Sequence, residues 1–435
     1  MTKLPRSLSL LDSTMINVGT MIGSGVFLVP SSVALYLMAP EPILLVWVLG
    51  GIVSVLGALA MAELGAAMPE AGGQVVYLAE AYSPIFGFLY GWTAFTFINP
   101  ASIAALAVAF VSYLGFFVTF DPVVAKIAAI GSIALLTGIN CLGVRFGATM
   151  QNVLTMLKVL LLLALVVAGL ALPSMAPDVV AVVVPEGSFA GRFALAMVIC
   201  LWAYDGWMEV TYVGGEVRDP GRNIPRSIVI SLVIVIGVYL LVNAALMVVL
   251  GVAGMAASTA VASDAAVATM GTVGAGFVAI GVMVSTMGTN NGLIFTTARA
   301  PYAMAQRGYF MKWAGAIHPR FKTPVVAMVL QGGWASIMAL TGTFNQLATY
   351  VVFASFVFYG MSAAGVLVLR RRKPDMPRPY KTWGYPVTPI LFIGFSLWLV
   401  GSTIVAAPVD AAIGLGMIGL GVPVFLYWKR RGEQG

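Results

Sequence analysis

The sequence predicts an all-α polytopic membrane protein whose core is an inverted repeat of two five-helix halves, with helices 1 and 6 discontinuous. Of the 435 residues, 60% are hydrophobic and 9% are charged, whereas about a quarter are charged in a typical soluble domain. The chain contains about twelve apolar stretches of the roughly 20 residues that a helix needs to cross a bilayer. Glycine-rich motifs interrupt two of these stretches, about five helices apart, which is the pattern of inverted-repeat transporters.

Short polar turns separate the predicted spanning segments and leave little chain for a soluble domain. The segments cover residues 12–38, 43–67, 84–116, 123–142, 148–172, 191–213, 227–251, 275–305, 324–342, 346–369, 385–407 and 411–428. No small-residue cleavage site follows the first apolar run, so we expect a retained helix rather than a signal peptide. Residues 1–383 form the predicted transport core, and residues 384–435 add two helices and a cytoplasmic tail.

The basic residues define the expected orientation in the membrane. All of the 23 Lys and Arg residues except Lys126, Lys158 and Arg192 fall in segments on one side of the predicted helices. Because basic residues are retained on the cytoplasmic side, we expect both termini to be cytoplasmic. The protein is therefore expected in the plasma (inner) membrane as a multi-pass protein.

The first interruption lies in helix 1, where Gly19, Gly23 and Gly25 fall close together. Glycine costs a helix about 1 kcal/mol relative to alanine, so the helix is expected to break here. A break in lipid is tolerated only where protein, water or a ligand pairs the freed backbone groups. The N–H groups of residues 23–26, with the Ser24 hydroxyl, would favour an anion such as a carboxylate. The alternative is a helix-packing face of small residues.

The second interruption, in helix 6, is the sequence Trp-Ala-Tyr-Asp-Gly-Trp at residues 202–207. Freed carbonyl groups around Ala203 and Tyr204 could accept hydrogen bonds from an ammonium group. The two interruptions together suit a zwitterion. Trp202 and Trp207 either pack between helices, as most tryptophans in membrane proteins do, or cover a bound substrate.

Asp205, inside the second interruption, has three possible roles. It could meet a cationic substrate side chain, titrate with a proton, or cap the helical half that follows it. Glu209 lies one turn later and could share any of these roles. Helix 8 carries a polar stripe that needs partners inside the protein and is expected to line the cavity, formed by Ser285, Thr286, Thr289, Asn290 and Asn291.

Lys158 lies about ten residues into the fifth segment, roughly 15 Å along the helix. A charge at the centre of a bilayer costs about 2.5–3.5 kcal/mol on insertion scales. The side chain could reach the membrane surface by snorkelling. Otherwise its ammonium faces inward, between helices 1 and 8, at a position that would need a cation. A fixed positive charge there would make sodium unnecessary.

Other site classes find little support in the sequence. Cys141 and Cys200 fall in apolar segments, so a disulfide is not implied, and the single histidine, His318, has no His or Cys nearby. We expect no metal, no cofactor and no enzyme activity, because an active site needs converging titratable groups. A channel filter is not visible either. The net charge of +7 follows the membrane topology and does not indicate nucleic acid.

Four motifs in order resemble the amino acid–polyamine–organocation superfamily and, within it, bacterial relatives of the L-type amino-acid transporters. They are Gly19 to Phe27; Pro69 to Gly73 with Tyr77-Leu78 and Gly91-Trp92; Trp202 to Trp207 with Glu216 to Arg226; and Arg299 to Ala305, ending at Gly308. The resemblance implies a LeuT-type fold of twelve helices and alternating access for amino acids without sodium.

The resemblance also implies roles for single residues. The substrate carboxylate would bind at Ser24 and Gly25 with Met21 nearby, and the amino group would meet carbonyls around Ala203. Trp202 falls at the position of the gating aromatic of the family. Lys158 falls where members of the family replace the second sodium site with a lysine.

Three departures and ambiguities concern partners and substrate. Eukaryotic relatives join a glycoprotein through a cysteine in the outer loop between helices 3 and 4, and the loop at Phe120-Asp121-Pro122 has none. No disulfide-linked heavy chain is therefore expected. Many relatives carry Asn where this chain has Met208, so that polar contact is not carried over. Asp205 matches members that accept cationic substrates, although transporters of small neutral amino acids resemble the same stretch.

The sequence thus favours a sodium-independent amino-acid transporter that exchanges neutral L-amino acids. The predicted substrate-binding residues are Met21, Gly23, Ser24, Gly25, Trp202, Ala203, Tyr204 and Asp205, with Lys158 replacing a sodium ion. Three alternatives remain: a proton-coupled symporter in which Lys158 or Asp205 titrates, a cationic amino-acid or polyamine carrier that uses Asp205, and a nutrient receptor with a transporter fold. The sequence leaves the oligomeric state open.

Overall fold

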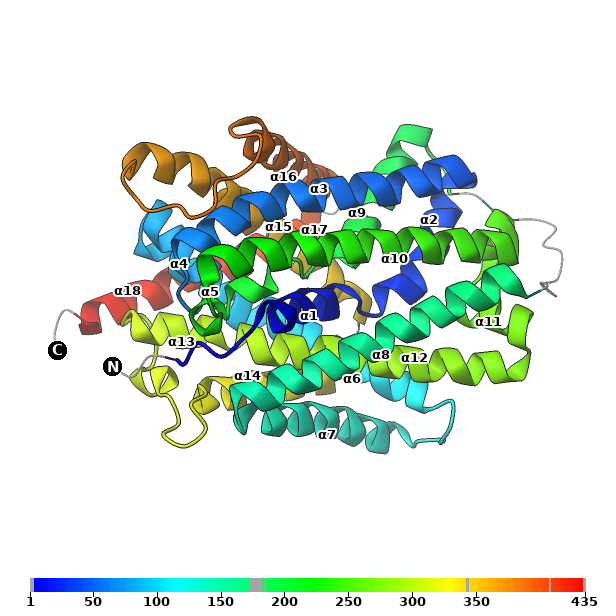
Figure 1. Ribbon diagram of the computed structural model, residues 1–435, viewed down its shortest axis with the longest axis horizontal. Coiled ribbons are helices and arrows are strands. Elements are labelled where there is room, and N and C mark those ends of the chain that lie inside the picture. The colour runs from blue at the N-terminus through cyan, green and yellow to red at the C-terminus, as the bar shows by residue number, and fades with distance from the viewer. Residues whose placement is uncertain (1–3, 173–181, 184, 342–343, 407, 433–435) are drawn as a thin grey trace.

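A bundle of long helices forms the molecule (Figure 1). The computed structural model describes residues 4–172, 182–183, 185–341, 344–406 and 408–432. Within these residues, nine helices are long and apolar enough to span a membrane, and the bent pair α1 and α2 makes a tenth. Two shorter apolar helices, Phe189–Tyr204 and Val325–Leu340, correspond to the sixth and ninth predicted segments. The predicted all-α polytopic fold is confirmed.

The helices follow one another without a sheet in the described residues. Their bounds are α1 Leu10–Met21, α2 Gly25–Leu37, α3 Pro40–Ala67, α4 Gln74–Ala81, α5 Pro84–Thr93, α6 Asn99–Leu114, α7 Pro122–Cys141, α8 Val144–Ala171, α9 Phe189–Tyr204, α10 Pro220–Ala257, α11 Val261–Met270, α12 Thr272–Thr297, α13 Arg299–Gln306, α14 Val325–Thr341, α15 Phe344–Arg372, α16 Val387–Ala406, α17 Pro408–Gly419 and α18 Gly421–Gly432. A π-helix, Ala94–Ile98, joins α5 to α6.

The first predicted interruption is confirmed. Helix α1 ends at Met21 and α2 begins at Gly25, with a bend of 44° between them. The side chain of Ser9 and the carboxylate of Asp12 form a capping box that fixes the start of α1. The bend lies about halfway along the combined span, where it opens backbone groups toward the interior of the bundle.

The second interruption is confirmed at Tyr204, but it differs from the expected pair of helical halves. After α9 the chain forms two short 3₁₀ turns, Glu209–Thr211 and Gly214–Glu216. The next α-helix begins only at Pro220, so the idea that Asp205 caps a following helical half is wrong. Gly206 has φ 110°, and a Cβ there would lie 3.0 Å from the Met21 nitrogen. The chain therefore turns sharply in order to cross α1, which prevents a continuous helix.

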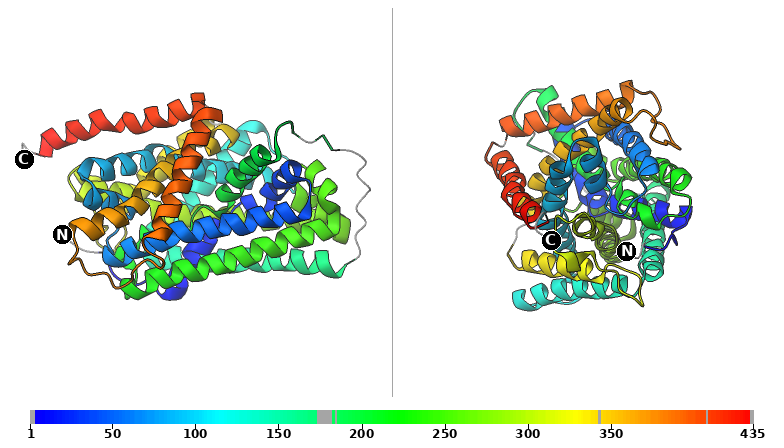
Figure 2. Two further views of the ribbon diagram at one scale, coloured as in Figure 1. Left: turned by 90° about the horizontal axis from the view of Figure 1, so that it is seen from above. Right: turned by 90° about the vertical axis from the view of Figure 1, so that its left-hand side faces the viewer.

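Three other boundaries correct the sequence-based segments. Helix α10 begins at Pro220 instead of residue 227, because Asp219 adopts a left-handed N-cap with φ 43° and Pro220 is suited to the first helical turn. Helices α4 and α11 are short and were expected as loops. The last predicted segment is confirmed as one span, Ala411–Arg430, formed by α17 and α18 in succession, which Figure 2 shows along the outside of the bundle.

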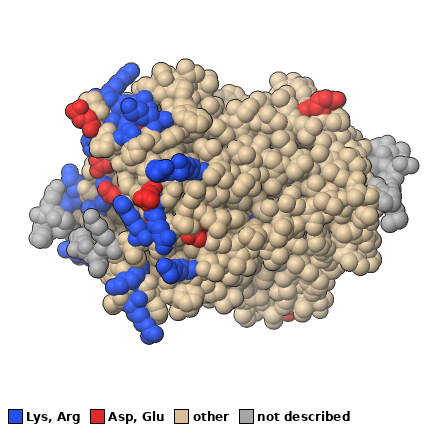
Figure 3. Space-filling model, in the orientation of Figure 1, with Lys and Arg blue, Asp and Glu red and all other residues tan. Residues whose placement is uncertain are grey.

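The charged residues mark one end of the molecule. The first and last described residues lie at the same end (Figure 1), and on the face in Figure 3 the Lys and Arg side chains gather there. Lys373 donates to Glu80 at 2.7 Å and Arg307 lies 3.6 Å from the same carboxylate. The Lys373 hydrogen bond, with the charge of Arg307, lowers the pKa of Glu80 below its ordinary value.

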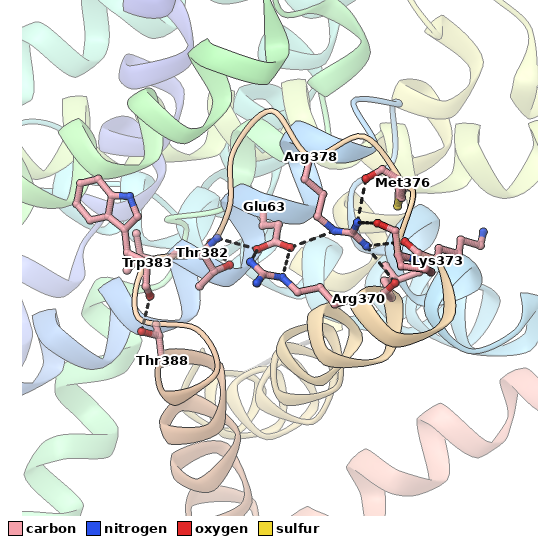
Figure 4. A network of polar contacts seen from close by, with 11 residues as sticks. Glu63, Arg370, Lys373, Met376, Arg378, Thr382, Trp383 and Thr388 are labelled. Carbon is pink, nitrogen blue, oxygen red and sulfur yellow. Dashed lines mark hydrogen bonds and ion pairs between the residues drawn. The ribbon is translucent and has the colours of Figure 1, made fainter.

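A buried acidic residue ties the loop between α15 and α16 to α3 at this charged end (Figure 4). Glu63 is 2% exposed and accepts hydrogen bonds from Arg370 at 2.6 and 2.9 Å. It also accepts one from the backbone of Thr382 at 2.7 Å, and Arg378 lies 3.4 Å away. The division of the chain at residue 383 stays a prediction.

Candidate functional site

A cavity of about 110 Å³ lies where the two interruptions meet. Seven of the eight predicted substrate-binding residues line it: Met21, Gly23, Ser24, Gly25, Trp202, Ala203 and Asp205. The eighth, Tyr204, points elsewhere. Its hydroxyl donates to the carbonyl of Trp47 at 3.0 Å, and its ring packs against Trp47 and Tyr239.

The interruption of helix 1 presents free amide groups at the cavity. The Gly23 N–H donates to Met21 O at 2.9 Å and the Phe27 N–H donates to Ser24 O at 3.1 Å. In the described part of the chain, the intervening amides of residues 24–26 have no backbone acceptor. They open helix α2, where the helix dipole favours an anion. Amide groups arranged in this way can hold an anion, and binding of a carboxylate here stays a prediction.

Gly25 and Ala203 bring the backbones of the two interruptions together. A Cβ on Gly25 would lie 3.2 Å from the Ala203 Cα and 3.5 Å from Cζ3 of Trp202. A glycine at position 25 therefore permits the close approach. The Trp202 ring lies beside the first turn of α2 and lines the cavity, whereas the Trp207 ring packs against Tyr359 and Phe392.

The carbonyl groups of the two interruptions share one donor. The hydroxyl of Tyr239, on α10, lies 2.8 Å from Met21 O and 2.8 Å from Ala203 O. A hydroxyl has one proton, so it satisfies only one of these carbonyls at a time. The other carbonyl can accept a hydrogen bond from an ammonium group in the cavity. Tyr239 could not be identified from the sequence, because a lone tyrosine in an apolar helix has no recognisable motif.

Lys158 is fully buried and faces inward, as predicted, so snorkelling is excluded. Its ammonium donates to Gly19 O and Ile22 O, both at 2.7 Å, on the last turn of α1. It also lies 3.0 Å from Ser285 O and 3.1 Å from Thr289 Oγ1 on α12. The ammonium therefore occupies an oxygen-lined position between the end of α1 and α12.

The polar residues predicted to line the cavity from the eighth spanning segment lie on α12. Some of them face the cavity, and others make contacts with neighbouring helices. Thr289 lines the cavity, and the Ser285 hydroxyl lies 2.9 Å from Ile22 O and 3.0 Å from Gly23 O. Asn291 bonds Gln151 of α8 at 2.8 Å and accepts from Asn140 of α7 at 2.9 Å. Thus only part of the stripe faces the cavity.

The other end of the cavity carries two carboxyl groups and several hydroxyl groups. The Tyr359 hydroxyl donates to Asp205 at 2.8 Å, and Thr296 lies 2.5 Å from Glu209. The hydroxyl groups of Tyr90 and Tyr212 contact each other beside them. No lysine, arginine or histidine is among the residues that line the cavity.

Several residues that line the cavity were not among the substrate-binding residues predicted from the sequence. They are Tyr90, Asn99, Ser102, Tyr212, Ser355 and Tyr359, contributed mainly by α5, α6 and α15. The π-helix immediately precedes Asn99, and such irregular turns are common at functional sites. No spacing in the sequence reveals a π-helix. Among the described residues, no group of three or more His, Cys, Asp and Glu could hold a metal ion.

Comparison with known proteins identifies the family of the chain. The sequence profile of the amino acid permease family matches residues 8–427. The chain is 32% identical to the serine/threonine exchanger SteT of Bacillus subtilis (strain 168) over 432 residues, 98% of each protein. It is 34% identical to the human b(0,+)-type amino acid transporter 1, over 94% of this chain and 84% of the relative. It is 33% identical to the human large neutral amino acids transporter small subunit 2, over 98% and 82%. The chain belongs to the amino acid permease family.

Proposed function

We propose that this membrane protein is a sodium-independent exchanger of neutral L-amino acids that works by alternating access. The observation that carries the proposal is the Lys158 ammonium, which binds carbonyl oxygens of α1 and α12 at 2.7–3.0 Å. Carbonyl and hydroxyl oxygens in this arrangement would otherwise suit a sodium ion. A covalently fixed charge holds α1 against α12 without an ion from solution.

The cavity supports a zwitterionic substrate. The free amides at the start of α2 and the Ser24 hydroxyl would hold the carboxylate. The Met21 carbonyl already accepts from the Gly23 N–H, so the Ala203 carbonyl, when the Tyr239 hydroxyl donates to Met21, would accept a hydrogen bond from the amino group. The substrate side chain would then extend toward Trp202 and Asp205. The relatives named above are a serine/threonine exchanger and amino-acid transporters, which supports exchange of amino acids as the function of this chain.

We further propose that the protein works without a disulfide-linked heavy chain and with both termini in the cytoplasm. Cys200 is buried, and Cys141 is half-buried at the end of α7, with its sulfur 3.9 Å from that of Met328. Neither position suits a bond to a second protein. The gathering of basic side chains at the end that holds the described termini supports the orientation.

The test is uptake of labelled L-serine into proteoliposomes that contain the purified protein. Vesicles loaded with unlabelled L-serine should take up label much faster than empty vesicles. Equal uptake into both would contradict exchange, and accumulation driven by an inward pH gradient would indicate proton symport instead. Saturable binding of L-serine without any flux would indicate a receptor.

A further inference from the structure

Two carboxyl groups line the cavity without a positively charged partner. Asp205 and Glu209 lie one turn apart on the segment that follows α9, and both contribute to the cavity wall. Glu209 is 6% exposed. Among the described residues, no ion pair includes either carboxyl group. The cavity therefore holds more acidic groups than its own basic groups can neutralise.

Within the described residues, the groups around Glu209 include hydroxyl groups but no unpaired cation. Four titratable side chains lie close enough to interact with Glu209. Asp205 and Tyr212 belong to the same segment as Glu209, Tyr90 belongs to α5, and Tyr359 belongs to α15. On α12 the nearest polar contact is Thr296.

Two buried basic side chains of α8 and α13, Lys158 and Arg299, already bind other groups. Arg299, one turn after Thr296, bonds both oxygens of Glu216 at 2.8 and 3.0 Å. Lys158 is held by α1 and α12. On α1, Asn17 uses its side-chain oxygen to accept from the Val210 N–H at 2.9 Å. Thus, within the described residues, Glu209 has neither a hydrogen bond nor an ion pair with a positively charged group.

Hydrogen bonding distinguishes the two carboxyl groups. Asp205 accepts a hydrogen bond from the Tyr359 hydroxyl at 2.8 Å, which offsets part of the cost of burying its charged form. In the described part of the chain, Glu209 accepts a hydrogen bond from the Thr296 hydroxyl alone, and that hydroxyl also lies 2.9 Å from Gly292 O. A carboxylate buried in a site of low polarity, with one hydroxyl donor and no cation, is costly in its charged form even without a charged neighbour, and the nearby Asp205 adds to this cost. A proton on Glu209 removes the second charge and supplies the hydrogen of the short bond to Thr296.

We propose that Glu209 is a proton-binding site of the transport cavity, and that a substrate with a cationic side chain displaces this proton. The inference rests on the proposed function, since it assumes that amino acids occupy this cavity. In the empty or serine-bound carrier, Glu209 is a neutral carboxylic acid. When an ammonium or guanidinium group enters, the O–H bond of Glu209 breaks, the proton passes to water, and the carboxylate pairs with the cation.

This exchange has a consequence for charge movement. The carrier loaded with a neutral amino acid holds a proton on Glu209, and the carrier loaded with L-lysine holds the lysine charge instead. Both loaded forms therefore have the same net charge. Exchange of lysine for serine should be electroneutral, with one proton moving with serine against each lysine.

The test measures protons released by the full-length purified protein in detergent, in weakly buffered solution with a pH indicator. Saturating L-lysine should release one proton per bound lysine, and saturating L-serine should release none. By linkage, lysine affinity should fall about tenfold for each unit of decrease in pH while Glu209 is protonated, and serine affinity should stay constant. Lysine that binds without releasing a proton, lysine that does not bind, or equal release by serine would overturn the proposal.

Two substitutions assign the proton to its residue. Glu209→Gln should abolish the release and remove the pH dependence of lysine affinity. Asp205→Asn should bind lysine more weakly but still release the proton, and this second variant decides the assignment if the first does not fold. Release that persists in Glu209→Gln, or that disappears in an Asp205→Asn variant that still binds lysine, would overturn the proposal. Failure of the proposed function has a separate signature, which is serine binding without serine exchange.

Discussion

Replacement of Lys158 should disable transport in the absence of sodium. Lys158→Met keeps an unbranched stem but removes an ammonium that meets four oxygen atoms at 2.7–3.1 Å. A hydrogen bond from a charged donor contributes about 1.5–3 kcal/mol, and a loss of 1.4 kcal/mol corresponds to about a tenfold change in an equilibrium constant. Loss of even one such bond from the transport-competent arrangement of α1 should therefore slow serine exchange at least about tenfold.

A smaller replacement should convert the position into a sodium site. Lys158→Ala leaves the carbonyl oxygens of Gly19, Ile22 and Ser285, with the Thr289 hydroxyl, facing an emptied space. Hard cations prefer oxygen ligands of this kind. Serine exchange by Lys158→Ala should be weak in choline chloride and should increase when sodium chloride replaces it.

The matched control is Lys126, an exposed lysine on α7 whose ammonium lies 3.3 Å from Leu340 O. Lys126→Ala should exchange serine at the wild-type rate in either salt. The reasoning is refuted if Lys158→Ala is as active as the wild type without sodium, or if sodium stimulates the wild type itself.

Three further substitutions test the framework of the site. Gly206→Ala forces alanine to φ 110° and places its Cβ 3.0 Å from backbone atoms of Thr20 and Met21. This substitution should therefore lower both the melting temperature and the exchange rate. The control Gly131→Ala, where a Cβ meets nothing within 4 Å, should change neither quantity. Arg299→Met leaves the buried Glu216 carboxylate unpaired and should lower the free energy of unfolding in denaturant by about 3–5 kcal/mol. The double variant Arg299→Met/Glu216→Gln should recover part of this loss. A denaturant midpoint of Arg299→Met equal to that of the wild type would contradict the prediction. Glu80→Gln should lower the melting temperature at neutral pH, because the lowered pKa of Glu80 means that its charged form stabilises the fold above its ordinary pKa. This difference should close as the pH falls through the lowered pKa, and a difference that persists in acid would show another cause.

The sequence predicted those features that the membrane itself constrains. The hydrocarbon core requires long apolar helices and penalises a buried charge, so the spans and the inward position of Lys158 followed from composition and spacing. The penalty for unpaired backbone groups likewise identified both interruptions. The same reasoning could not predict that 3₁₀ turns follow α9 in place of a second helical half, since this depends on how closely Gly206 approaches α1.

The direction of single side chains was less predictable. Successive residues of a helix point about 100° apart, so with Ala203 at the cavity the neighbouring side chain of Tyr204 turns toward Trp47. Tyr239, Tyr90 and Tyr359 meet at the site from three different helices, and their positions depend on the rotation of each helix in the bundle. Hydropathy does not encode this rotation.

The most direct test of the central claim is the initial rate of L-serine exchange by the wild-type protein in proteoliposomes loaded with L-serine. Sodium chloride would be replaced by choline chloride on both sides of the membrane, at constant pH and ionic strength. The account predicts equal rates in the two salts, because Lys158 already occupies the position between α1 and α12. A rate that falls about tenfold in choline chloride would contradict it.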